Sequence, residues 1–169
     1  MGKRIDLLVM DVDGTLTDGK LYIGNEGEMF KAFSVKDGFG IKNVLRKNEI
    51  TPVIITGRES RIVLKRCEEL GISHVYQGVE NKREALLKVI SDFGVSPGRV
   101  AYIGDDENDL ECMEYLLKND GVVGCPEDSA LEVLKRSGVY HCKRRGGDGA
   151  VREFIQHIIC DLSVELFVV

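Results

Sequence analysis

The sequence predicts a doubly wound α/β fold built on a parallel sheet. Short runs rich in valine and isoleucine alternate with longer amphipathic segments along the 169 residues, and this alternation is typical of βαβ units. Runs such as PVIIT (52–56) and VAYIG (100–104) are apolar throughout. Strands of this kind are covered on both faces, as the strands of a parallel sheet are.

The elements follow in order from these patterns. The expected strands are residues 5–10, 52–56, 74–77, 100–103, 122–124 and 139–141. The expected helices are residues 38–48, 60–70, 82–93, 108–117, 129–137 and 150–160. Helical periodicity is clearest in REALLKVISDF, where four apolar side chains share one face: Leu86, Val89, Ile90 and Phe93. No linker, repeat or low-complexity stretch interrupts the chain, so we expect a single domain over residues 1–169.

One segment departs from the βα alternation. GKLYIGNEGEMFKAF (19–33) predicts a β-hairpin insertion that turns at GNEG. Its apolar residues fall on both faces: Leu21, Tyr22, Ile23, Met29 and Phe30. Because an isolated two-stranded hairpin is marginally stable in water, we expect it to pack against another subunit. The alternative is that one face lies on the parent core.

Composition narrows the class of protein. The chain is 43% hydrophobic and 30% charged, with a net charge of −5, which fits one globular core and favours neither nucleic acid nor an anionic membrane as partner. The five cysteines form no CxxC pair, so reduced thiols and a cytoplasmic protein are expected. The first apolar run is too short for a signal peptide, and no window is long enough to span a bilayer.

Acidic residues follow two of the predicted strands. Asp11 and Asp13 end the first strand in DVDGTLTDG, and GDDEND places Asp105, Asp106 and Asp109 after the strand 100–103. In a doubly wound sheet the ligand site lies outside the carboxyl ends of the strands. So many carboxylates cannot ionise together without a cation. A set of ligands that are all oxygen atoms favours Mg²⁺. We therefore expect Asp11, Asp105 and one or both of Asp106 and Asp109 to hold it.

Two further strand ends supply a phosphate site. Thr56, Gly57 and Arg58 follow the second long strand, and Lys82 lies in the first turn of a helix. A cation there is unfavourable unless an anion is bound nearby, as helix N-termini bind phosphate. The alternative is an ordinary solvated lysine. Metal, hydroxyl donor and cation together predict phosphoryl transfer.

The two aspartates of DVDGT can take different roles. Asp11 ends the strand and can attack phosphorus as a carboxylate nucleophile. Asp13 precedes Gly14, where the chain can turn sharply. It can therefore protonate the leaving oxygen and then deprotonate the attacking water.

Basic residues outside the strand ends are candidates for substrate binding. Arg144 and Arg145 lie in the glycine-rich segment KRRGGDGAVREF, which can close over an anionic substrate and exclude water. The alternative is a turn before the last helix. Arg66 is a further candidate, and the alternative for it is a solvated charge on a helix face. The C-terminal DLSVELFVV is unusually apolar for a chain end and indicates an interface or packing on the parent core.

These motifs resemble the haloacid dehalogenase-like phosphatase superfamily. DVDGTLTDG, Thr56, Lys82 and GDDEND match its four motifs in order. The resemblance implies a Rossmann-like fold, Mg²⁺ dependence and an aspartyl-phosphate on Asp11. It also implies that the backbone carbonyl of Asp13 and the side chain of Asp105 hold the metal.

The spacing of the motifs narrows the resemblance. The two gaps that hold a cap domain in larger members are too short here, so the chain resembles the capless group. FSVKDGFGI, IITGR, YQGVENK and RRGGDGAVREF are similar to segments of the 3-deoxy-D-manno-octulosonate (KDO) 8-phosphate phosphatases of lipopolysaccharide precursor synthesis. The resemblance to these phosphatases implies a homotetramer whose hairpins meet in a central barrel. In such a tetramer Arg66 and the tail loop of one subunit would reach the active site of a neighbouring subunit.

The substrate implied is a sugar acid phosphate, with Arg58 placed to pair with its carboxylate. A sister group acting on nine-carbon sialic-acid-like 9-phosphates tends to carry Glu in place of Arg58 and Lys in place of Glu69. The sequence therefore favours the eight-carbon acid and leaves the nine-carbon acid as an alternative.

Three other classes of protein remain as alternatives. A phosphorylation-controlled receiver domain has a similar acidic cluster, but it orders its motifs differently and needs no equivalent of Asp13. A non-catalytic oligomerisation module would not need the full acidic set. A phosphomutase normally needs a cap.

Overall fold

The computed structural model describes residues 4–163 and contains a six-stranded parallel sheet. The strand order is β5-β4-β1-β6-β7-β8. Their bounds are β1 Leu7–Met10, β4 Thr51–Ile55, β5 His74–Tyr76, β6 Val100–Ile103, β7 Val122–Cys125 and β8 Val139–His141. The chain adds strands on one side of β1, then returns and builds outward from its other side. The predicted doubly wound fold is confirmed, and its strand order reverses between β1 and β6.

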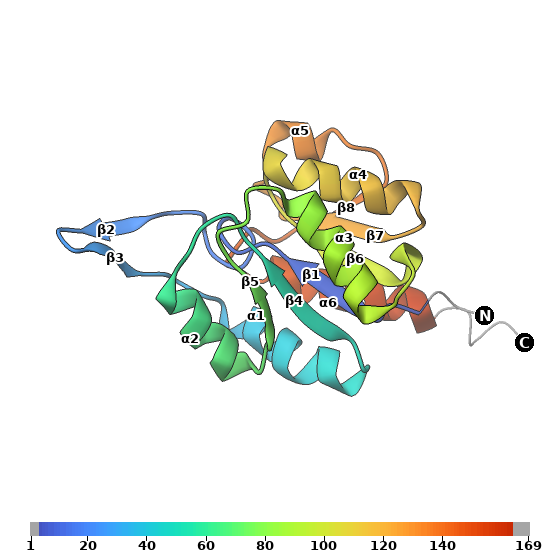
Figure 1. Cartoon of the computed structure of the whole chain (residues 1–169), viewed down its shortest axis with the longest axis horizontal. Coiled ribbons are helices and arrows are strands. Elements are labelled where there is room, and N and C mark those ends of the chain that lie inside the picture. Colours follow the sequence, from blue (N-terminus) through green and yellow to red (C-terminus); the bar gives the residue numbers. More distant parts are fainter. Residues whose placement is uncertain (1–3, 164–169) are drawn as a thin grey trace, which may run out of the picture.

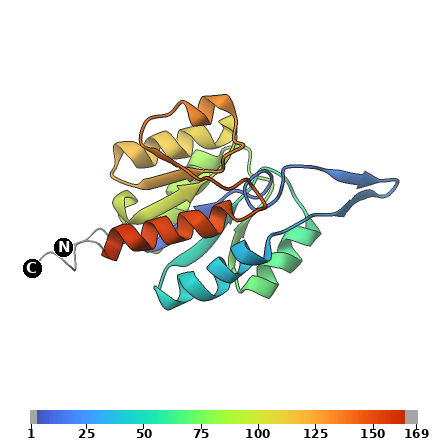
Figure 2. The ribbon, with the colours of Figure 1, turned by 180° about the vertical axis from the view of Figure 1, so that it is seen from behind.

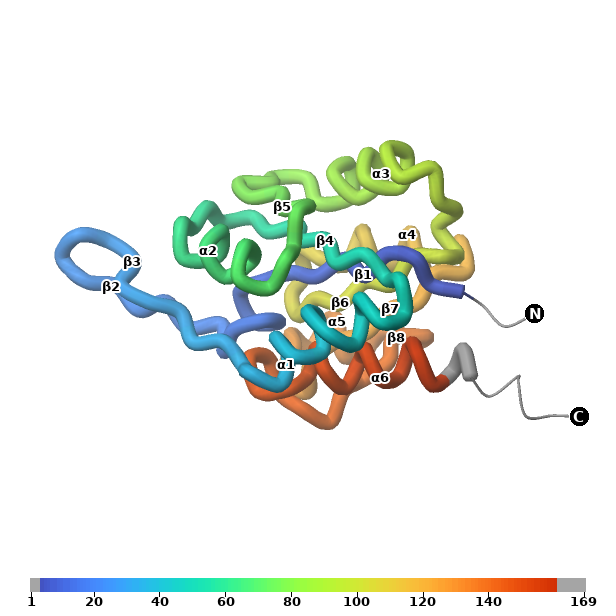
Figure 3. Tube along the Cα trace, turned by 90° about the horizontal axis from the view of Figure 1, so that it is seen from below, coloured from blue at the N-terminus to red at the C-terminus, as the bar shows by residue number. Residues whose placement is uncertain are grey.

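Helices cover both faces of the sheet (Figures 1 and 2). One face carries α1 (Val35–Phe39), the π-helical η1 (Gly40–Leu45), α2 (Arg61–Leu70) and α6 (Ala150–Ser163). The other carries α3 (Lys82–Phe93), α4 (Leu110–Lys118) and α5 (Leu131–Leu134). Two short 3₁₀ turns, η2 (Pro97–Arg99) and η3 (Glu107–Asp109), flank β6. Figure 3 shows the same two layers from below.

Strands such as β1 are apolar throughout because helices cover both faces of the sheet. Side chains of β1 alternate between the two cores: Leu8 and Met10 pack on the α1–α6 side, and Leu7 and Val9 on the α3–α4 side. All four are at most 1% exposed, so each position of the strand must be apolar.

Two helices differ from the sequence prediction by two or more residues at both ends. The helix expected at 38–48 begins at Val35, because the Ser34 side chain accepts from the backbone N–H groups of Lys36 and Asp37. It then continues as η1 to Leu45. The helix expected at 129–137 is only the short α5, Leu131–Leu134.

The predicted hairpin is confirmed and extends away from the sheet (Figures 1 and 3). It consists of β2 (Tyr22–Gly24) and β3 (Gly27–Phe30), paired antiparallel around the GNEG turn. Ile23 is 59% exposed and Met29 is 64% exposed. The parent core therefore does not cover these side chains, and the subunit that would cover them stays a prediction.

No cap domain is inserted, as the short gaps predicted. Only the hairpin, α1 and η1 lie between β1 and β4, and only α2, β5, α3 and η2 lie between β4 and β6. All five cysteines are free. Over residues 4–163, no helix has the length and apolarity needed to cross a bilayer. The apolar tail DLSVELFVV falls mostly outside the described residues.

Candidate active site

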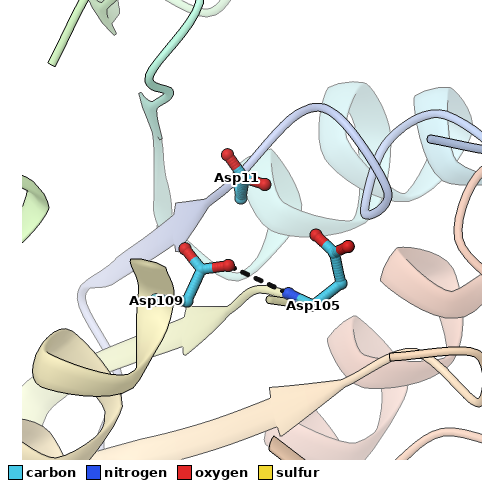
Figure 4. Close-up of side chains that lie close together, drawn as sticks. All are labelled: Asp11, Asp105 and Asp109. Carbon is cyan, nitrogen blue, oxygen red and sulfur yellow. Dashed lines mark hydrogen bonds between the residues drawn. The ribbon is translucent and has the colours of Figure 1, made fainter. Parts of the chain in front are cut away.

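Three carboxyl groups gather beyond the ends of β1 and β6 (Figure 4). Asp11 follows β1 directly, and its N–H donates to the Ile103 carbonyl at 3.0 Å, so the two strands stay paired up to the site. Asp105 follows β6, and Asp109 ends η3. One oxygen from each of the three lies within 4.8 Å of the others. The structure thus brings together Asp11 and Asp105, as the strand ends predicted.

Asp109 is fully buried and uses both of its carboxylate oxygens. Oδ1 accepts from Lys82 Nζ at 2.8 Å and from the Tyr102 hydroxyl at 2.6 Å. Oδ2 accepts from the backbone N–H groups of Asp105 at 3.0 Å (dashed in Figure 4) and Asp106 at 3.2 Å. Asp109 therefore holds the loop after β6 and orients Lys82. Its role as a direct metal ligand stays a prediction.

Lys82 lies inside the acidic cluster. It is the first residue of α3 and is 4% exposed, so the alternative of a solvated lysine is wrong. Its ammonium group is 2.8 Å from Asp11 Oδ1 and 2.8 Å from Asp109 Oδ1. Burial alone would lower the pKa of Lys82, but the two carboxylates raise it above its ordinary value. The lysine is thus a fixed positive charge beside Asp11.

The remaining negative charge calls for a cation. Burial raises the pKa of Asp11 to about 6, with repulsion from Asp109 adding to it. Burial, then Asp11 and Asp109, raise the pKa of Asp105 to about 8. Thr15 donates to Asp105 Oδ1 at 3.0 Å. Asp11 and Asp105 offer only oxygen ligands, and their negative charges repel each other, so the pair fits Mg²⁺.

A cavity of about 270 Å³ opens onto these carboxylates. Thr56, Gly57 and Arg58 line it together with Asp13, so the loop after β4 reaches the same site. Arg58 Nε is 3.9 Å from Asp13 Oδ2. The wall is completed by Asp11, Gly19, Leu21, Asp105, Asp106 and Asn108. The predicted groups on the loop after β4 therefore share one space with Asp13, the predicted acid–base group.

Asp106 lies at the rim of this cavity. It is exposed, and its Oδ1 accepts from the N–H of Glu107 at 2.8 Å, which caps η3. The structure therefore gives Asp106 a structural contact. The contact engages one of its two carboxylate oxygens, and its metal role stays a prediction.

Asp13 is held by a lysine that the sequence did not single out. Lys31, just after β3, has a side chain only 1% exposed and donates to Asp13 Oδ1. Lys31 Nζ also lies 2.8 Å from Glu28 Oε1, and Glu28 accepts from the Ser60 hydroxyl at the start of α2. Burial would lower the pKa of Lys31, yet the hydrogen bonds and charges of Asp13 and Glu28 raise it.

Three predicted substrate-binding arginines lie outside this cavity in the single chain. Arg66 pairs with Glu69 at 2.8 Å, and its guanidinium lies 5.7 Å from the Phe33 ring centre. Arg145 pairs with Asp128 at 3.2 Å. Arg144 lines a separate cavity on the α6 side. Their role in substrate binding stays a prediction.

The loop that carries the last two arginines does contact the first motif. The Gly147 N–H donates to the Thr15 carbonyl at 3.0 Å. A Cβ atom at Gly146 would overlap the Gly14 carbonyl, so only glycine lets the two backbones approach this closely. The prediction that this segment is near the site is supported by its backbone, while its arginine side chains point elsewhere.

Sequence reasoning missed Lys31, Thr15 and Tyr102. Tyr102 carried a signal: its hydroxyl lies in an otherwise apolar buried strand and needs a partner. Thr15 stands inside the quoted DVDGT motif but was given no role. Lys31 carried no signal, because only the folded hairpin brings it to Asp13.

The site and fold together define a haloacid dehalogenase-like hydrolase, and the model of that family matches residues 40–115. The 3-deoxy-D-manno-octulosonate 8-phosphate phosphatase of Escherichia coli K12 is 42% identical over 160 residues, covering 95% of this chain and 79% of the relative. That of Salmonella typhimurium is 43% identical with the same coverage. The chain belongs to this family of phosphatases, as its motifs predicted.

Solved structures agree with this assignment. The Moraxella catarrhalis phosphatase, in complex with magnesium ion, phosphate ion and KDO, gives a TM-score of 0.85 at 36% identity, covering 98% of this chain and 95% of that one. The cobalt-bound enzyme of Haemophilus influenzae gives 0.87 at 32% identity, covering 99% and 95%.

Proposed function

We propose that this chain is a Mg²⁺-dependent phosphatase that hydrolyses KDO 8-phosphate to KDO and phosphate. The observation that carries the proposal is the convergence of Asp11 and Asp105 beside the buried Lys82 at the mouth of a cavity. The relatives named for this activity share that part of the chain. Residues 1–169 would form a single phosphatase domain with the hairpin (19–33) as an insertion.

The metal would be held by Asp11, Asp105 and the backbone carbonyl of Asp13. When bound, Mg²⁺ neutralises negative charge and polarises a phosphate oxygen. Asp109, whose oxygens are already engaged, would act by holding the Asp105 loop. Asp106 would join through Oδ2, because its Oδ1 caps η3.

The chain's own residues would carry the two chemical steps. In the first, an Asp11 oxygen forms a bond to phosphorus while the bond from phosphorus to the sugar oxygen breaks, and Asp13 gives that oxygen a proton. In the second, Asp13 takes a proton from water, whose oxygen bonds to phosphorus and releases Asp11 with inorganic phosphate. Lys82 and the Thr56 hydroxyl would hold the phosphate oxygens throughout.

Arg58 would set the preference for a sugar acid. It lines the cavity and is about half exposed, so it can pair with a carboxylate at the mouth. Arg66, Arg144 and Arg145 would contribute to a neighbouring subunit's substrate in a homotetramer joined through the hairpin. The reduced thiols fit a cytoplasmic enzyme. No contact with nucleic acid or membrane is proposed.

A nine-carbon sugar acid 9-phosphate is the second candidate substrate. Arg58 and Glu69 favour the eight-carbon acid, since the nine-carbon group tends to carry Glu and Lys at these positions. The complete acidic set disfavours a non-catalytic module.

A phosphate-release screen tests the proposal. Purified protein is assayed on KDO 8-phosphate, a nine-carbon sugar acid 9-phosphate and p-nitrophenyl phosphate, each with Mg²⁺ and with EDTA. We expect the highest kcat/KM on KDO 8-phosphate, and loss of release in EDTA. Asp11→Asn should abolish release while the protein stays folded, because it removes the nucleophile. Substantial turnover in that variant would contradict the role of Asp11.

A further inference from the structure

We infer that Lys31 is a positioning residue that fixes the carboxylate of Asp13 for proton transfer to the leaving group. The inference deepens the proposed phosphatase function and rests on it. It makes the hairpin part of the catalytic arrangement within one subunit.

Lys31 is held by contacts to two acidic side chains. Its side chain is 1% exposed and lies between two carboxylates, that of Asp13 and that of Glu28. Glu28 is in turn tied to Ser60, which caps α2 just after the Arg58 loop. A run of hydrogen bonds thus joins the hairpin, the first motif and the loop after β4.

Lys31 reaches the cavity through Asp13 rather than by lining it. The cavity wall includes Asp13 and Arg58 but not Lys31, so the lysine stands behind Asp13. It engages Asp13 Oδ1 and leaves Oδ2 on the side of Arg58 at 3.9 Å. Lys31 therefore selects which oxygen faces the cavity and limits rotation of the carboxylate.

Fixing Asp13 matters most for a poor leaving group. The sugar leaves as a primary alkoxide, which needs a proton as the bond to phosphorus breaks. p-Nitrophenolate leaves readily without one. A displaced Asp13 should therefore slow hydrolysis of the sugar phosphate far more than hydrolysis of the aryl phosphate.

The test compares kcat and KM of Lys31→Met on KDO 8-phosphate and on p-nitrophenyl phosphate. A misplacement of about 1 Å can lower the rate about 10²-fold, so we expect a loss of about that size in kcat on the sugar phosphate. On the aryl phosphate we expect a loss of only a few-fold, with KM little changed on either. Lys31→Arg should recover part of the loss. Lys88→Met removes a lysine from the exposed Lys88–Asp92 pair on α3 and should match wild type.

Equal losses on the two substrates, or a change in KM alone, would overturn the inference. In an Asp13→Asn background Lys31→Met should cause no further loss on the sugar phosphate, and an additive loss would also refute it. If Lys31→Met does not fold by circular dichroism, Glu28→Gln replaces it. Glu28→Gln keeps Lys31 but weakens its second anchor, and should show the same substrate dependence with a smaller loss.

The inference can fail separately from the proposed function. Wild type that hydrolyses p-nitrophenyl phosphate and another sugar phosphate, but not KDO 8-phosphate, would refute the proposed substrate. The Lys31 comparison would then run on that other alkyl phosphate. Wild type with no phosphatase activity would refute the proposed function, and the role of Lys31 with it.

Discussion

Replacing Asp109 with asparagine tests whether this buried carboxylate supports the site through hydrogen bonds. Asparagine keeps the shape of the side chain but has one acceptor oxygen where aspartate has two. If that oxygen keeps the backbone N–H groups of Asp105 and Asp106, the amide NH₂ faces Lys82 and the Tyr102 hydroxyl. Tyr102 can turn its hydroxyl to accept, but the Lys82 ammonium has only hydrogens to offer.

The magnitude follows from these contacts. The lost bond from Lys82 is charge-assisted, worth about 1.5–3 kcal/mol, and leaving donors unpaired adds about 1–3 kcal/mol. Removing the charge also relieves the repulsion between Asp109 and the carboxylates of Asp11 and Asp105, whose pKa values Asp109 helps to raise. This relief offsets part of the lost stability. We expect a net loss of about 2–3 kcal/mol in the free energy of unfolding, or roughly 5–10 °C in Tm.

Urea and thermal unfolding in EDTA measure this loss. Asp92→Asn, in the exposed pair with Lys88, is the matched control and should cost no more than about 0.5 kcal/mol. The rise of Tm with Mg²⁺ concentration reports metal affinity. Asp109→Asn should weaken that affinity much less than Asp105→Asn does.

Two results would refute the reasoning. A loss of stability below about 1 kcal/mol would mean that the four hydrogen bonds of Asp109 do not hold the loop. Equal weakening of Mg²⁺ binding in the Asp109 and Asp105 variants would mean that Asp109 is itself a metal ligand.

Four further predictions test the metal site, the substrate and the assembly. Because the folded pKa of Asp105, about 8, lies above its ordinary 3.8, metal-free protein should lose stability as pH rises toward 8, by at most about 1.4 kcal/mol per pH unit; thermal melts should show Mg²⁺ abolishing this loss, and a flat profile in EDTA would count against it. Gly14→Ala places a Cβ onto the Asp105 carboxylate at a φ of +92°, so Mg²⁺ should no longer raise Tm, whereas an unchanged rise would contradict the contact. Arg58→Ala should raise KM about tenfold on KDO 8-phosphate, the size of a lost pairing near 1.4 kcal/mol, and little on p-nitrophenyl phosphate; equal increases in steady-state assays would remove Arg58 as the carboxylate partner. Ile23→Glu should shift the protein to smaller species in sedimentation, because Ile23 is 59% exposed on the hairpin, and an unchanged mass would argue against assembly through this surface.

The centre of the site could be predicted from the sequence because the geometry of a parallel sheet determines where most of its residues lie. Asp11 and Asp105 each follow an apolar strand, and the carboxyl ends of such strands share one edge. Once β1 and β6 pair, the two carboxylates must approach. Lys82 was expected there for a similar reason, since α3 begins at that edge.

The contacts that depend on local turns or on the hairpin could not be predicted. The sequence left open whether Asp106, Asp109 or both turn inward, and the 3₁₀ turn η3 puts Asp109 inside and Asp106 at the rim. Lys31 becomes buried only because the chain that leaves β3 returns to the loop that carries Asp13. The start of α1 was missed because the Ser34 cap precedes the apolar pattern on which the boundary was based.

The pairing of β1 with β6 has a consequence for how the molecule is held together. β4 and β5 lie on one side of this seam, and β7 and β8 lie on the other, so the sheet's left and right wings come from the first and second halves of the chain. An ion shared by Asp11 and Asp105 would span that seam and join residues 94 positions apart, much as a crosslink does. Metal occupancy would then reinforce the fold at its midline as well as equip it for chemistry.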